Sequence, residues 1–180
     1  MEALSKPELI SLLQAARTHS PKHWLMILVA YSHGLRASEV VRLQRDAVAD
    51  GHLTVARLKG SLRTVQPLIS DLEPLLDERA ALLAFVTPMR FNQRLFPVTR
   101  QHFWRLMQRY AKAAGIPERK RHPHVLKHTV AMQTIHSAGI ENVRQYLGHK
   151  SMSSTGAYLK KTDAEASVAI GLALQGSSGD

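Results

Sequence analysis

The sequence contains no cysteine and no long apolar run, and each absence excludes a class of protein. Without cysteine the chain has no disulfides, no thiolate metal site and no cysteine nucleophile. No apolar stretch approaches the roughly 20 residues needed to span a bilayer. The run 24–31 is too short and lies too far inside the chain for a signal peptide. These absences are compatible with a reducing cytoplasm, where we expect the protein to act.

Acidic residues are also in short supply. The chain has 24 Lys and Arg but 14 Asp and Glu, for a formal net charge of +10. A basic surface attracts nucleic acid through release of counterions. The charge could instead serve only solubility. Binding to an anionic membrane is disfavoured, because no basic amphipathic helix with a strong aromatic edge is present.

Hydrophobic periodicity predicts one mostly helical domain (α+β) with a small antiparallel sheet. Helices are expected at 6–18, 22–33, 37–43, 70–87, 101–114, 124–138, 141–147 and 163–174. Ser5 is the expected N-cap of the first helix, and the second is apolar nearly all round and therefore central. Asp50 and Gly51 predict a turn, followed by a hairpin of strands 52–58 and 62–68.

Arg36 follows the end of the second helix at Gly34 and opens the next helix. A guanidinium grips phosphate through a planar fork, best when it is held rigid. Glu39 lies three residues later and could support it. The competing interpretation is a weak surface ion pair. Lys59 falls near the hairpin tip, where it could act as a general acid or be an ordinary solvated lysine.

His124, Lys127 and His128 are spaced to share one face of a helix. Such a face could contact phosphate oxygens. Together with His122 it could instead bind a metal, but no acidic ligand or HExxH pattern accompanies the histidines. They could also be ordinary polar residues at the start of a helix.

Tyr158 lies nine residues after His149, which a Leu-Gly turn precedes. A phenol has a pKa of about 10 and needs nearby positive charge or a base to become a nucleophile. Taken alone, Tyr158 is better interpreted as a core tyrosine that packs with Leu159.

The order of these motifs resembles the catalytic domain of the tyrosine recombinase, or phage integrase, family. The motifs are Gly-Leu-Arg-x-Ser-Glu (34–39), Lys-Gly (59–60), His-x-x-basic-His-Thr (124–129), Leu-Gly-His (147–149) and the tyrosine at 158. Leu95-Phe96-Pro97 and the segment 103–116 also resemble that family. The resemblance covers roughly residues 5–165.

The resemblance implies that Tyr158 attacks a scissile DNA phosphate, forming a 3′-phosphotyrosyl link and freeing a 5′-hydroxyl. It assigns charge stabilisation to Arg36 and Lys127, hydrogen bonding to His124 and His149, and leaving-group protonation to Lys59. Further DNA contacts are expected from Arg119, Lys120, Arg121, His128 and Lys150. Fixed cations supply the electrostatics, so no metal or cofactor is expected.

Two departures from the family pattern stand out. Lys127 occupies a position where the family usually has arginine, so the charge is kept and the bidentate fork is lost. We hypothesise that lysine still suffices. The expected domains are a catalytic domain (1–162) and a tail helix (163–180), with the family's N-terminal core-binding domain absent. The apolar tail is expected to dock on a neighbouring protomer, giving a homo-oligomer on double-stranded DNA, or to pack on its own domain.

Three alternatives remain at this point. The chain could grip DNA without efficient chemistry, as the lysine at 127 would permit. It could relax supercoils like a type IB topoisomerase, which uses the same chemistry. It could be a metal-dependent hydrolase built on His122, His124 and His128.

Overall fold

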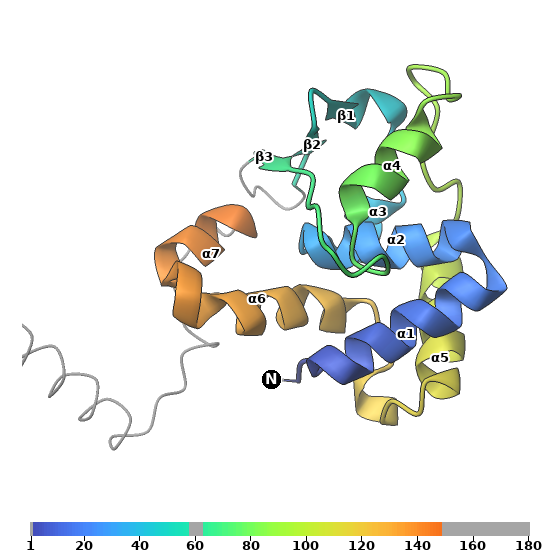
Figure 1. The fold of residues 1–180 in the computed structure, drawn as a ribbon, viewed down its shortest axis with the longest axis vertical. Coiled ribbons are helices and arrows are strands. Elements are labelled where there is room, and N and C mark those ends of the chain that lie inside the picture. Colours follow the sequence, from blue (N-terminus) through green and yellow to red (C-terminus); the bar gives the residue numbers. More distant parts are fainter. Residues whose placement is uncertain (1, 58–62, 149–180) are drawn as a thin grey trace, which may run out of the picture.

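A computed structural model describes residues 2–57 and 63–148 of the chain. Helices and a small antiparallel sheet make up this part, which confirms the predicted fold class (Figure 1). The α-helices are α1 (Lys6–His19), α2 (Pro21–Ser32), α3 (Ala37–Val40), α4 (Glu78–Val86), α5 (Arg100–Ala113), α6 (His124–Ala138) and α7 (Ile140–Tyr146). The 3₁₀ turns are η1 (Arg45–Ala47) and η2 (Glu118–Lys120), and the strands are β1 (Val48–Ala49), β2 (His52–Val55) and β3 (Thr64–Pro67). Within the described ranges, no helix is long and apolar enough to cross a membrane.

The start of α1 is fixed by the predicted cap. The Ser5 hydroxyl accepts the Glu8 N–H at 3.3 Å, and the Glu8 carboxylate accepts the Ser5 N–H at 2.7 Å. This reciprocal capping box satisfies two backbone donors that the helix itself leaves unpaired. Pro7 lies in the first turn, where a missing N–H costs nothing.

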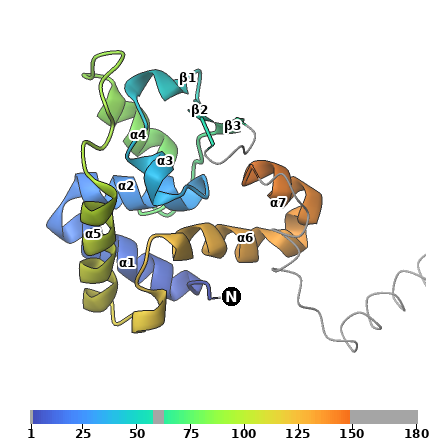
Figure 2. The same ribbon diagram turned by 180° about the vertical axis from the view of Figure 1, so that it is seen from behind.

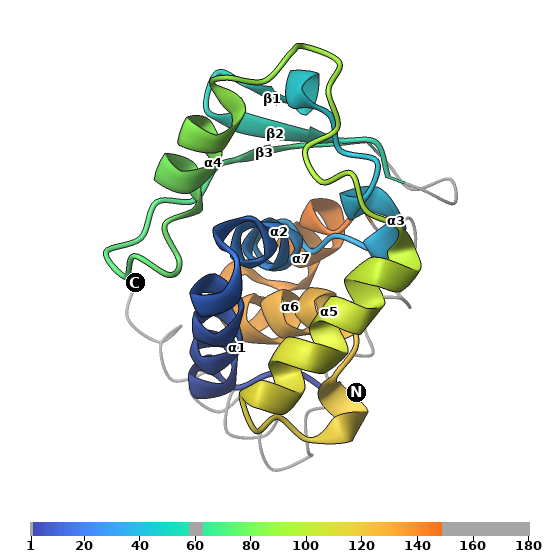
Figure 3. The ribbon, with the colours of Figure 1, turned by 90° about the vertical axis from the view of Figure 1, so that its right-hand side faces the viewer.

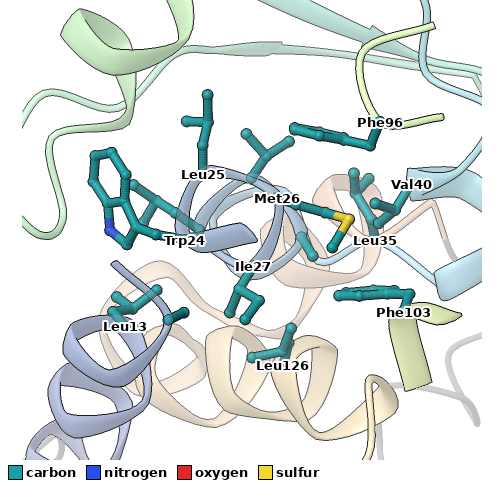
Figure 4. Close-up of a cluster of buried hydrophobic side chains, with 14 of the residues drawn as sticks. Leu13, Trp24, Leu25, Met26, Ile27, Leu35, Val40, Phe96, Phe103 and Leu126 are labelled. Atoms are coloured by element: carbon teal, nitrogen blue, oxygen red, sulfur yellow. The ribbon is translucent and has the colours of Figure 1, made fainter. Parts of the chain in front are cut away.

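The apolar helix α2 is central, as predicted. It contacts α1, α3, α4 and α6. Its side chains radiate in several directions, with Trp24 on one side, Met26 on the opposite side toward Leu35, and Ile27 toward Leu126 (Figure 4). A helix that is apolar on every side gains most by being surrounded, which accounts for its position. In the view from behind, α5 crosses in front of α1 and α2 (Figure 2).

The sheet and α4 form a layer at one end of the helices (Figure 3). The strand order is β1-β2-β3, antiparallel throughout, with Leu53 opposite Val48 on one side and Gln66 on the other. The predicted turn at Asp50 and Gly51 joins β1 to β2 with positive φ at both residues. The predicted hairpin is confirmed by the pairing of β2 with β3, and its tip lies outside the described residues. Strand β1 was not predicted.

The predicted helix at 70–87 is wrong at its start, because α4 begins only at Glu78. The Asp71 side chain accepts the Glu73 N–H at 2.8 Å, which closes a local turn in place of a helix. The carbonyl of Leu75 accepts the indole N–H of Trp24 at 3.0 Å. Asp77 then caps the helix, its side chain accepting the Ala80 N–H.

Candidate functional site: a buried carboxylate with cations around it

Arg36 is the N-cap residue of α3 and Glu39 lies in its first turn, shortly after the left-handed Gly34 that follows α2. The Glu39 carboxylate accepts the Arg36 backbone N–H at 2.8 Å and its Nη1–H at 3.1 Å. The Glu39 side chain is fully buried, whereas 26% of the Arg36 side chain is exposed. The two residues are thus in contact, as their spacing predicted, and part of the Arg36 side chain remains exposed.

Lys127 points from α6 into the protein and is 1% exposed. Its Nζ donates to the carbonyl of Leu147 at 3.0 Å, just beyond the end of α7. Burial, followed by the charges of Arg36 and Arg57, lowers its pKa to about 7, although Glu39 acts in the opposite direction. Lys127 therefore shares an electrostatic environment with Arg36, but its ammonium is already bonded to the backbone.

The two histidines predicted to share a face with Lys127 are in contact with each other. The His124 and His128 rings meet edge to face with centroids 4.4 Å apart. Desolvation, followed by the charge of Lys127, lowers the pKa of His124. The residue as a whole is nevertheless exposed. Desolvation, followed by His124 and His122, lowers the pKa of His128 to about 4. Both rings are thus disposed to be neutral near pH 7.

Arg57 is a site residue that the sequence interpretation missed. Its side chain is fully buried and its Nη1 lies 3.2 Å from the Glu39 carboxylate. A signal was present, because Leu53, Val55 and Arg57 fall on alternate positions and the two apolar residues are buried. A charged residue in register with a core face indicates a buried partner.

The basic loop around η2 is tied to the start of the chain. Arg119 pairs with Glu2 at 2.6 Å, and Lys120 pairs with Glu8 at 2.9 Å. The Arg121 Nε–H donates to the Ile116 carbonyl at 2.6 Å. Arg119 remains 67% exposed, whereas Lys120 is largely covered at 17%. Their predicted contacts with DNA stay predictions.

Four predicted site residues lie outside the described residues, namely Lys59, His149, Lys150 and Tyr158. The tail 163–180 and the proposed domain boundary also lie there. Among residues 2–57 and 63–148, no three His, Asp or Glu side chains are grouped to hold a metal ion. The described ranges therefore bring together Arg36, Glu39, Arg57, Lys127 and the His124–His128 pair.

The family model described as "Phage integrase family" matches residues 2–165, and the chain belongs to that family. The tyrosine recombinase XerD of Xanthomonas campestris pv. campestris is 32% identical over 176 residues, covering 87% of this chain and 54% of the relative.

Solved structures share the fold. The XerH site-specific recombinase in a pre-cleavage complex with difH superposes with a TM-score of 0.74 at 18% identity, covering 93% of this chain and 53% of that one. A lambda integrase tetramer bound to a Holliday junction gives a TM-score of 0.67 at 19% identity, covering 90% of this chain and 50% of that one. The chain spans about half the length of these relatives.

Proposed function

We propose that the chain is the catalytic domain of a site-specific DNA recombinase that cleaves and rejoins strands through a 3′-phosphotyrosyl intermediate. The observation that carries the proposal is the position of the Arg36 guanidinium. The buried Glu39 carboxylate holds it, while part of the Arg36 side chain remains exposed. His124 and Lys127 of α6 lie close enough to interact with it electrostatically. Cationic groups held in fixed positions suit a phosphate whose charge grows in the transition state. Family membership supplies the reaction class.

In this proposal the Tyr158 hydroxyl loses its proton to solvent, and its oxygen forms a bond to the scissile phosphorus as the bond to the 5′-oxygen breaks. The leaving oxygen takes a proton from Lys59, so a free 5′-hydroxyl results. Arg36 stabilises charge on the non-bridging oxygens, and His124 and His149 donate hydrogen bonds to the same phosphate. The phosphotyrosyl ester conserves the bond energy, so attack by the 5′-hydroxyl of another strand reseals the DNA without ATP.

Lys127 has a distinct place in this scheme. Its pKa of about 7 means that a substantial fraction of the side chain is neutral near physiological pH. A phosphate nearby favours the charged form, because opposite charge raises the pKa of an ammonium. Lys127 would thus gain its full charge when DNA is bound. Loss of cleavage in Lys127→Ala, with retention in Lys127→Arg, would support this role.

A nicked suicide duplex tests the reaction, because loss of a short 5′-hydroxyl fragment traps the covalent adduct. We expect the native chain to form a protein–DNA adduct and Tyr158→Phe to form none. Tyr110→Phe is the matched control, since Tyr110 bonds His23 in the helical core at 2.7 Å and should leave adduct formation intact. DNA binding by the native chain with no adduct would refute the enzymatic proposal and indicate a binding module.

Ligation to a second strand separates recombination from topoisomerase activity. A recombinase joins the trapped end to an added strand with a free 5′-hydroxyl from a partner site. Relaxation of supercoiled plasmid without such joining would contradict the recombinase proposal.

Oligomerisation through the tail is the second part of the proposal. A cavity of about 400 Å³ lies between α2, α6 and α7, with Tyr31, Val130, Ala131, Val143 and Leu147 in its lining. Segment 164–174 is rich in Ala, Val, Ile and Leu, so an apolar recess fits its chemistry. We expect it to dock in this cavity of a neighbouring protomer on DNA.

Truncation before residue 163 tests the tail. It should reduce assembly on DNA, measured by sedimentation, while single-site binding persists. A native monomer whose tail resists proteolysis would argue that the tail packs on its own domain.

A further inference from the structure

Arg57 is buried at an unusual place for a charged residue. It follows β2 on the face that carries Leu53 and Val55, and its side chain is fully buried. Burial of a guanidinium is costly unless its charge is paired and its donors are satisfied. Burial lowers the pKa of Arg57, and Glu39 opposes that effect by its charge and its hydrogen bond.

Every N–H of the Arg57 guanidinium has an acceptor, which leaves none for a ligand. The contacts are Nε to Thr64 Oγ1 at 3.1 Å, Nη1 to the Gly34 carbonyl and Glu39 Oε2 at 3.2 Å each, and Nη2 to the carbonyls of His33 at 2.9 Å and Tyr146 at 3.0 Å. A planar fork with all its donors used is held in a single orientation. Arg57 therefore acts through the groups that it binds.

Those acceptors belong to the parts of the site that must be aligned. Glu39 holds Arg36 by both its backbone and its side chain. Tyr146 is the last residue of α7, and the next carbonyl, that of Leu147, accepts from Lys127. Carbonyls at the end of a helix lack partners within the helix, and here Arg57 and Gln66 donate to that of Tyr146 while Lys127 donates to that of Leu147.

We propose that Arg57 is a positioning residue that locks the Arg36–Glu39 unit to the carboxyl end of α7. That end leads through Gly148 directly to His149 in the sequence. One guanidinium thereby links Arg36, through Glu39, to the carboxyl end of α7, and in this proposal it does so without touching the phosphate. The proposal rests on the proposed function for its catalytic consequence, whereas the structural link stands independently.

The catalytic consequence is tested with two substrates. Arg57→Met removes the charge and the fork, and Arg57→Lys keeps the charge but loses the fork. Single-turnover adduct formation is measured on a suicide duplex with either a phosphodiester or a methylphosphonate at the scissile position. A methylphosphonate lacks the charge on one non-bridging oxygen, so correct placement of Arg36 matters less to its reaction.

We expect Arg57→Met and Arg57→Lys each to slow the phosphodiester reaction by about 100-fold, the usual effect of losing one preorganised donor. The loss should shrink to within about 10-fold on the methylphosphonate, as it should for Arg36→Ala. A merely unstable protein would lose the same fraction of activity on both substrates. Equal losses, or Arg57→Lys reacting at the native rate, would overturn the proposal.

Arg45→Met is the matched control. Arg45 also joins separate segments through backbone carbonyls, with Nε to Val86 at 3.0 Å and Nη1 to Val48 at 2.9 Å, but neither acceptor belongs to the site. Its substitution should lower stability and leave the ratio of the two substrate rates unchanged. A ratio that shifts as much as in Arg57→Met would show that the effect is general.

Hydrogen exchange tests the structural link without DNA. The Arg36 N–H is bonded to Glu39, so Arg57→Lys should speed its exchange and that of the last turn of α7 by about 10-fold or more, with α5 unaffected. Unchanged exchange would overturn the proposal even if catalysis fell. Absence of adduct from the native chain would instead refute the proposed function and leave this link intact.

Discussion

Replacement of Lys127 by methionine should change how the stability of the protein depends on pH. The substitution keeps most of the volume of a side chain that is 1% exposed and removes its charge. In the folded protein the pKa of Lys127 is lowered from 10.5 to about 7, with burial as the main cause. Between these two values the unfolded chain binds more protons at this residue than the folded chain does. The free energy of unfolding therefore rises with pH in that window, and the contribution is absent in Lys127→Met.

The size of the effect follows from the shift. Each pKa unit corresponds to about 1.4 kcal/mol, so native Lys127 costs the folded state about 4 kcal/mol at pH 7. From pH 7 to pH 9 the native protein should gain about 2 kcal/mol relative to the variant. Loss of the hydrogen bond to Leu147 costs the variant about 1–3 kcal/mol at any pH. At pH 7 the variant should equal or exceed the native protein in stability, and this advantage should shrink or reverse by pH 9.

Urea unfolding, monitored by tryptophan fluorescence at pH 6, 7, 8 and 9 and constant ionic strength, measures the difference in free energy of unfolding between the two proteins. All other titrating groups are common to both proteins, so their contributions largely cancel. Lys112→Met, at an exposed position of α5, shows how much of the pH dependence comes from net charge alone. A difference between native and Lys127→Met that stays constant within 0.5 kcal/mol, roughly a third of one pKa unit, would refute the reasoning.

Two further substitutions probe contacts that bring the site together. Gly34→Ala should destabilise the protein by about 2–3 kcal/mol in urea unfolding, because φ is +56° and a Cβ would overlap the Leu147 side chain; native stability in this variant would contradict the close approach. Thr129→Val should cost about 1–2 kcal/mol, because its hydroxyl accepts the Leu4 N–H at 2.9 Å and donates to the Val125 carbonyl at 2.8 Å. An unchanged midpoint for this variant would mean that water or another group replaces the lost acceptor.

Features set by neighbouring residues were predicted well from the sequence. The capping box of α1, the apolar α2 and the Asp50-Gly51 turn each depend on residues a few positions apart. The predicted start of α4 was wrong because the true start depends on groups that are distant in the sequence. Trp24 holds the Leu75 carbonyl, and the imidazole of His33 lies 2.7 Å from the Glu78 carboxylate, both fully buried. Neither contact leaves a periodic signal in the sequence.

In the functional site, too, contacts between neighbouring residues were predicted and contacts between distant residues were not. The spacing of Arg36 and Glu39 predicted their contact, since three residues on a helix bring side chains together. The spacing of His124, Lys127 and His128 predicted a shared face but not the bond of Lys127 to a carbonyl 20 residues away. Arg57 was missed because the alternation of the strand was used to find apolar residues, and a charge in register with them was not considered.

The balance of charge within the described site connects its stability to its proposed ligand. Arg36, Arg57 and Lys127 influence one another around the single carboxylate of Glu39, and the two arginines lower the pKa of Lys127. Full protonation of Lys127 would leave three cations facing one anion. A DNA phosphate would supply the missing negative charge. It would therefore bind most favourably to the protein with Lys127 protonated, which is the less stable form when no phosphate is bound. If so, the lysine at position 127 couples phosphate binding to proton uptake near neutral pH. An arginine there would remain charged throughout this range, because the pKa of a guanidinium lies far above neutral pH.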